Sequence, residues 1–150
     1  MDARPAPTAT APGGVDVWER WLPAWHVYHV GVVVVTAVLA FAGHQVDAAE
    51  LPIVVAGLAI LLGAYWAVWL RQNVWSSRLT TRIGYAILLL AVFAILMSIA
   101  PAFTFLQFTL YPQLFFCLPN RWAIPAGLSI GLILALDALV DAGGDAAAAG

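Results

Sequence analysis

The stretch FTFLQFTLYPQLFFCLPNRWAIP, residues 103–125, decides how the rest of the chain is interpreted. Its first part is apolar enough to enter a lipid bilayer, yet it contains amide side chains, a tyrosine and a proline at membrane depth. It ends at Arg121 and Trp122, a pair that is typical of a membrane surface. These features predict a membrane protein with several spans, in which this stretch has a special role.

The composition favours a membrane protein over a soluble domain. Of the 150 residues, 63% are hydrophobic and 9% are charged, so too few polar side chains exist to cover a water-facing surface. A spanning helix needs about 20 apolar residues, because the hydrocarbon core is about 30 Å thick. Backbone groups must be paired within lipid, so each apolar block is predicted to be a helix. A β-barrel would need alternating polar positions, which runs such as 32–35 lack.

The order of apolar blocks predicts an all-α membrane protein, a bundle of five transmembrane helices. The predicted spans are about 25–42, 51–70, 83–100, 103–118 and 122–140. Because the fourth block is short, a re-entrant hairpin formed by the third and fourth blocks is kept as an alternative.

The segments outside these blocks have their own predictions. Residues 1–14, rich in Pro, Ala and Thr without an apolar period, are predicted to be a disordered tail. Residues 15–24 are predicted to form a short amphipathic helix in the membrane interface, capped by Asp16 and closed by Pro23. Residues 141–150 are predicted to be an external tail. Their acidic, Ala- and Gly-rich sequence also resembles a loop before a further span, so a fragment is expected.

Arginine positions predict the orientation. The chain has no lysine, and with five spans all six arginines fall on one side of the membrane. The positive-inside rule then places the N-terminus in the cytoplasm and the C-terminus of this chain outside the cell membrane. The residues predicted to anchor the chain at this membrane surface are Trp18, Trp21, Trp25, Trp69, Arg71, Arg78, Arg82, Arg121 and Trp122.

Gln107, Tyr111, Pro112 and Gln113 are the candidates for a signal-switching site or for the lining of a binding cavity. Pro112 has no backbone N–H, so the carbonyl of Phe108 is predicted to lose its partner and the helix to kink. Gln107 and Tyr111 share one helix face, whereas Gln113 lies on another. Amides facing lipid are costly, so the block is predicted to be the central helix or to lie between two protomers. The alternative is that these groups only bond neighbouring helices.

Ala123, Gly127, Gly131 and Ala135 recur at every fourth residue of the last block. Small residues let helices approach closely, so this row is predicted to be a helix-packing surface. Packing within the chain is favoured, and a homodimer is the alternative use of the same row.

The remaining reactive residues predict no catalytic, metal or cofactor site. His26 and His29 are expected at the membrane interface, because no third histidine lies at their depth. His44 and Asp47 fall in an outer loop, where a plain solvated loop is favoured over proton or metal sensing. Cys117 is the only cysteine, so a cysteine-based metal site is excluded. The lipid bilayer is the expected partner, and nucleic acid is not.

The string LYPQLFFCLPNRWAIPAG, residues 110–127, is similar to the polytopic membrane input region of bacterial two-component sensor histidine kinases. In that family a Y-P-Q-x-F…L-P-x-R-W-A-I-P string joins the penultimate spans, and here it runs from Tyr111 to Pro125. The segments Trp25-His26-Val27-Tyr28 and Ala100-Pro101-Ala102-Phe103 also fit. The resemblance covers about residues 18–140, and residues 111–125 are its most specific part.

The resemblance implies a sensory module that is not catalytic by itself. The family has a further span, a dimerisation helix with a phosphoacceptor histidine, an ATP-binding domain and a response regulator as partner. None of the three histidines here lies in a phosphoacceptor motif, so no enzyme activity is expected within these residues. The alternative, from another class, is a small complete integral membrane protein that acts as a transporter-like carrier or as a subunit of a complex.

Overall fold

The computed structural model describes residues 17–71 and 78–148. The tail predicted at 1–14, the capping residue Asp16 and the last two residues of the chain lie outside the described residues. The same holds for the side chains of Trp18 and Arg71, two of the predicted surface anchors.

Helices make up the described part of the chain, which contains no strand. In chain order they are α1 (Val17–Ala42), α2 (Leu51–Tyr65), the π-helix η1 (Trp66–Arg71), α3 (Leu79–Met97), the 3₁₀ helix η2 (Pro101–Leu106), α4 (Gln107–Cys117) and α5 (Asn120–Ala148). Four helical stretches are long and apolar enough to cross a membrane: Trp21–Ala42, Leu51–Trp69, Leu79–Met97 and Asn120–Val140. The prediction of an all-helical chain with several apolar helices long enough to cross a membrane is therefore confirmed for these residues, whereas the fourth of the five predicted spans is not among them.

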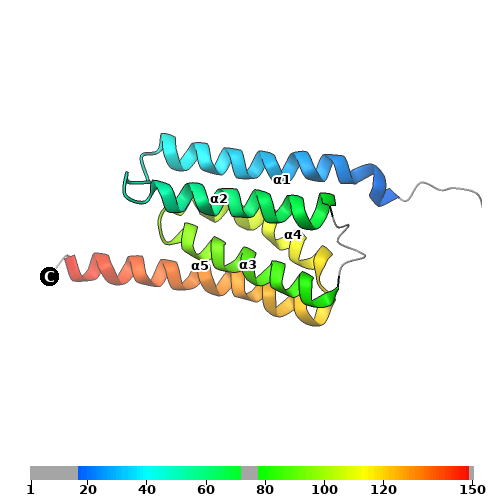
Figure 1. Ribbon diagram of the computed structural model, residues 1–150. Helices are drawn as coiled ribbons and strands as arrows, with labels where there is room; N and C mark the ends of the chain where they lie inside the picture. The colour runs from blue at the N-terminus through cyan, green and yellow to red at the C-terminus, as the bar shows by residue number, and fades with distance from the viewer. Residues whose placement is uncertain (1–16, 72–77, 149–150) are drawn as a thin grey trace, which may run out of the picture.

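The fourth predicted span is built differently from the others. It begins as the six residues of η2 and continues as the eleven residues of α4. A 3₁₀ helix rises about 2.0 Å per residue and an α-helix about 1.5 Å, so together they extend roughly 28 Å. Figure 1 shows this segment running back alongside the other helices, from the end where α3 stops to the end where α5 begins.

Successive helices run in opposite directions, as Figure 1 shows. The loop at 43–50, the turn at 98–100 and the C-terminal end of α5 lie at one end of the bundle. The other end is termed the arginine end, because the helix termini that reach it carry Arg20, Arg71, Arg78, Arg82 and Arg121.

The segment formed by η2 and α4 lies in the middle of the bundle, as the sequence predicts for the fourth block. It packs against α1, α3 and α5. Its inward side chains Phe103, Leu106, Leu110 and Leu114 are fully buried. Helices α1 and α5 lie farther out, where Val27 and Leu128 are exposed as lipid-facing residues would be.

A side chain from the loop at 43–50 fixes where η2 begins. The backbone N–H of Ala102 donates a hydrogen bond to Gln45 Oε1 at 3.0 Å. The first backbone donors of a helix have no partner within the helix. Gln45 supplies that partner and ties the α1–α2 loop to the start of the central segment.

The two ends of the chain differ from the prediction. No separate interfacial helix ends at Pro23, because α1 continues through this proline. A proline removes one helical hydrogen bond and can bend a helix without ending it when suitable residues continue on both sides. At the other end, α5 extends to Ala148 where a tail was predicted from residue 141. Alanine is the strongest helix former, which accounts for this extension.

Candidate functional site

Gln113 of α4 lies at the centre of a buried group of polar side chains. Its Nε2 is 2.8 Å from His29 Nδ1 of α1 and 3.1 Å from Thr109 Oγ1. Its Oε1 accepts a hydrogen bond from the hydroxyl of Tyr85 of α3. His29 Nδ1 also lies 2.7 Å from Thr109 Oγ1. His29, Tyr85, Thr109 and Gln113, all buried, are termed the polar cluster.

Tyr65, the last residue of α2, connects the polar cluster to a second histidine. Its ring stacks on the ring of His29 with the centroids 3.9 Å apart. Its hydroxyl lies 2.6 Å from Nδ1 of His26, which is half-buried one turn nearer the arginine end. Four helices, α1, α2, α3 and α4, therefore meet through side chains at this depth.

The orientation of the Gln113 amide corresponds to one protonation state of His29. A carboxamide nitrogen only donates, so the Nδ1 atom that faces Gln113 Nε2 must present its lone pair. The imidazole is then neutral, with its proton on Nε2. That Nε2 atom is buried and has no partner among the described residues. Thr36 Oγ1, two turns farther along α1, is buried and unpartnered in the same way.

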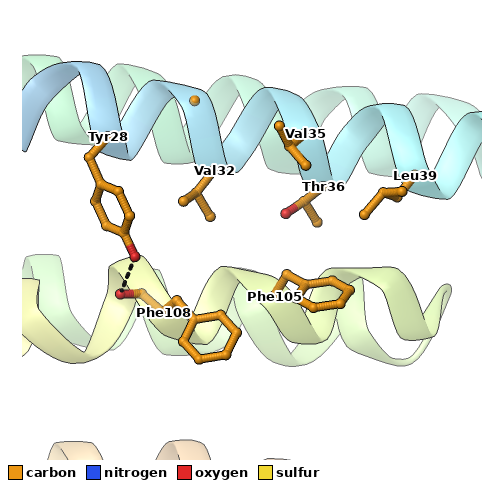
Figure 2. Close-up of a pocket in the computed structure, with 8 residues that line it drawn as sticks. Tyr28, Val32, Val35, Thr36, Leu39, Phe105 and Phe108 are labelled. Carbon is orange, nitrogen blue, oxygen red and sulfur yellow. Dashed lines mark hydrogen bonds between the residues drawn. The ribbon is translucent and has the colours of Figure 1, made fainter.

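Pro112 affects the contact between α4 and α1. It has no N–H to offer to the carbonyl of Phe108, as the sequence predicts. The structure supplies another donor, because the hydroxyl of Tyr28 on α1 donates to Phe108 O at 3.2 Å. Figure 2 shows this bond between the two helices. The helix α4 continues through Pro112, and its freed carbonyl is satisfied from α1.

An open groove of about 420 Å³ runs along the same contact, between α1 and the central segment. Tyr28, Thr36, Phe105 and Phe108 line it together with aliphatic side chains of α1 (Figure 2). No charged residue lines the groove, and its largely apolar surface is suited to contact with lipid chains. The polar chemistry of this region is therefore concentrated in the polar cluster.

Gln107 and Tyr111, two of the predicted switching residues, lie outside the polar cluster. Both are half-buried. A Cβ placed on Gly127 of α5 would lie 3.5 Å from Tyr111 Cε1, so Tyr111 packs over that glycine. The side chain of Gln107 forms no hydrogen bond with another residue that the structure describes. Of the four candidates, only Gln113 is a member of the polar cluster, and Pro112 is its neighbour in sequence.

The row of small residues in α5 divides along its length. Ala123 and Gly127 are buried, where α5 packs against α4. Gly131 and Ala135, nearer the opposite end, are exposed. The first half of the row therefore packs within the chain.

The predicted surface anchors lie at the arginine end, and several are exposed there. Trp21 and Trp122 are 65% and 45% exposed, and Arg78 and Arg121 are also exposed. Arg82 is half-buried, and its Nη1 donates to the carbonyl of Cys117 at 3.2 Å. A cation bonded to a last carbonyl of a helix stabilises the C-terminus of α4.

Trp25 and Trp69 differ from the predicted surface role, because their rings pack within the protein. Trp69 is 7% exposed and stacks against Tyr65 with the centroids 5.8 Å apart. Trp25 is half-buried, with its ring centroid 5.9 Å from that of Phe116. The apolar area of an indole ring can fill a helix contact as well as a membrane interface.

The prediction of an interfacial role is also wrong for His29, whose side chain is buried in the polar cluster. Sequence reasoning missed Tyr65 and Tyr85 as its neighbours. The sequence contained one indication of this contact. Each tyrosine is a polar side chain inside an apolar block, and His29 and Gln113 are polar side chains inside other apolar blocks.

The polar cluster consists of neutral hydrogen-bonding groups and contains one histidine. Within the described ranges, no three His, Cys, Asp or Glu side chains come close enough to hold a metal ion. Comparison with known proteins gives no family: no protein-family model, no curated protein and no solved structure matches the chain.

Proposed function

We propose that this chain is the membrane-embedded sensory module of a bacterial two-component sensor histidine kinase, which transmits a signal by rearranging its helices. The observation that carries the proposal is the polar cluster, in which Gln113 joins α1, α3 and α4 beside Pro112. The similarity of residues 111–125 to the family string supports it from the sequence. Phosphotransfer would belong to downstream kinase domains acting with a second protomer and a response regulator.

A signal module needs two packings of similar free energy. Hydrogen bonds between membrane helices contribute only about 0.6 kcal/mol on average, so exchanging one set for another costs little. The packing described leaves His29 Nε2 and Thr36 Oγ1 buried without partners. An arrangement of α1 against α4 that satisfies these atoms would recover part of their desolvation cost. A stimulus then acts through its different affinities for the two arrangements.

In this proposal the chain crosses the cell membrane five times, with η2 and α4 as the fourth crossing. The roughly 28 Å that they extend is close to the hydrocarbon thickness of about 30 Å. The arginine end then faces the cytoplasm, where the positive-inside rule places basic residues. The loop at 43–50 and the C-terminal end of α5 face the exterior.

The native reading frame tests the family assignment directly. We expect it to continue beyond residue 150 into a further span, a helix with a phosphoacceptor histidine and an ATP-binding domain. A stop codon directly after Gly150 would contradict the kinase assignment. That result would favour the small integral membrane protein, either a carrier or a subunit of a complex.

Autophosphorylation of the full-length protein in lipid nanodiscs tests the switching role. Gln113→Leu removes the amide that joins three helices, so we expect the basal rate to change several-fold, up to about tenfold for a shift of about 1.4 kcal/mol. Gln107→Leu is the matched control, because it makes the same chemical change outside the polar cluster. An unchanged rate in a folded Gln113→Leu protein would show that the cluster is only a scaffold.

A further inference from the structure

We propose that the polar cluster responds to protons: the packing described here requires neutral His29, and protonation of His29 favours the other packing. The inference deepens the proposed function and rests on it for the existence of a second packing. It assigns the proton as the ligand and His29 as the residue that binds it.

The geometry around His29 Nδ1 opposes a second N–H as long as the Gln113 amide keeps its orientation. Gln113 Nε2 already points a donor at Nδ1 from 2.8 Å. A proton on Nδ1 would set two donors against each other, because a carboxamide nitrogen has no lone pair to offer. Thr109 Oγ1, at 2.7 Å, can accept from His29, but the amide must still turn away. When the amide turns, Nε2 of Gln113 replaces Oε1 opposite the hydroxyl of Tyr85, so the hydrogen bond to α3 changes as well.

The described side chains around His29 also include no negative charge that would stabilise an imidazolium. The titratable groups near His29 are His26 on α1, Tyr65 on α2, Tyr85 on α3 and, one turn beyond Gln113, Cys117 on α4. The cation Arg82 of α3 lies one turn before Tyr85, toward the arginine end.

Among the described side chains of the packed helices, no carboxylate faces this histidine. The acids whose side chains the structure describes are Asp47, Glu50 and Asp137, and they lie toward the opposite end of the bundle. A buried charge without a partner is strongly disfavoured, so protonation selects a packing that admits water or an acceptor to His29.

The direction of the pH effect follows from proton counting. The packing described binds one proton fewer at His29 than a packing in which the imidazole is free. Acidification therefore shifts the population toward the free packing. A free histidine is protonated below about pH 6.5, so the ratio of the two packings should change up to about tenfold per pH unit below that value.

Alkylation of Cys117 by N-ethylmaleimide in lipid nanodiscs tests the inference. Cys117 is the only cysteine, and its side chain is buried one turn from Gln113 on α4. The alkylation rate is divided by that of the detergent-unfolded chain at each pH, because the thiolate fraction itself depends on pH. We expect the relative rate to rise up to about tenfold per pH unit between pH 6.5 and 5 and to stay constant above pH 7.

His29→Gln should abolish the rise, and the control His44→Gln, on the distant loop, should keep it. A flat profile in the unmodified chain, or a rise that persists in His29→Gln, would overturn the inference. The ¹⁵N NMR spectrum of the unmodified chain gives a test that no variant can confound. At pH 7.5 we expect His29 with a lone pair on Nδ1 and the proton on Nε2, and a proton on Nδ1 would overturn the inference.

These measurements use no kinase output. A flat alkylation profile removes the proton as ligand, whereas the reading frame and the autophosphorylation rates decide the proposed function separately.

Discussion

At the scale of single residues, one carboxamide determines how the centre of the bundle is held together. The Nε2 atom of Gln113 donates toward α1 and to Thr109 on its own helix, and its Oε1 atom accepts from α3. Both the nitrogen and the oxygen of the amide are therefore hydrogen-bonded. A fully buried amide without these partners would be costly at membrane depth. The amide therefore specifies which faces of α1 and α3 meet α4, although the net energy of each bond is small.

Replacing Gln113 by leucine should lower the stability of the bundle. The substitution keeps the approximate size of the side chain but leaves the hydroxyl of Tyr85 and Nδ1 of His29 buried without this partner. We expect the free energy of unfolding, measured by titration with a denaturing detergent, to fall by about 1–3 kcal/mol. Gln107→Leu should change it by much less. Equal losses in the two variants would refute the special position of Gln113.

The bond from Tyr28 to Phe108 predicts coupling between two distant positions. Tyr28→Phe removes the donor to the carbonyl that Pro112 leaves free, and should cost about 0.5–1.5 kcal/mol of unfolding free energy. In a Pro112→Ala background the alanine N–H can donate a hydrogen bond to that carbonyl, so Tyr28→Phe should lower the unfolding free energy only slightly. A double-mutant cycle measures this difference. Additive effects would mean that Tyr28 does not compensate for the proline.

At the scale of helices, close packing is local to a few small residues. A Cβ on Gly57 of α2 would approach Leu96 Cδ2 of α3 to 3.0 Å, whereas a Cβ on Gly63 of the same helix meets nothing within 4 Å. The α2–α3 contact therefore depends on one glycine and not on the general presence of glycine in α2. In α5, Gly127 has the corresponding role against α4, where an added Cβ would lie 3.4 Å from Phe115 Cε2.

Leucine substitutions at the two glycines of α2 should separate these cases. Gly57→Leu forces α2 and α3 apart and should lower the unfolding free energy by about 1–3 kcal/mol. Gly63→Leu faces open space and should be neutral or slightly stabilising, because leucine has the higher helix propensity. Thermal unfolding in nanodiscs measures both. A similar loss for both variants would show that the α2–α3 contact is not limited by Gly57.

Sequence alone located the helices better than their contacts. Long apolar blocks place α2 and α3 within a few residues, since hydrocarbon thickness fixes the length of a span. The same blocks do not show which face is buried, because lipid-facing and protein-facing residues are equally apolar. Gln113 was identified because an amide in lipid is costly. The partners Tyr65 and Tyr85 depend on the rotation of each helix, which the apolar pattern does not record.

At the scale of the whole molecule, one segment decides the topology. If η2 and α4 cross the membrane, all arginine-bearing helix ends lie on one side, as the positive-inside rule favours. If they do not cross, α5 begins on the other side, and Arg121 is separated from Arg78 and Arg82. The extended rise of the 3₁₀ turns is what lets so short a segment approach the thickness of the hydrocarbon core.

Labelling of single cysteines in intact cells tests this central claim most directly. Asp47, Ser98 and Asn120 are exposed positions in or beside the α1–α2, α3–η2 and α4–α5 connections, and each is changed to cysteine in a Cys117→Ser background. A membrane-impermeant maleimide added outside should label Asp47→Cys and Ser98→Cys, and should label Asn120→Cys only after the membrane is permeabilised. Labelling of Asn120→Cys from outside, or protection of Ser98→Cys from both sides, would contradict the five-crossing bundle.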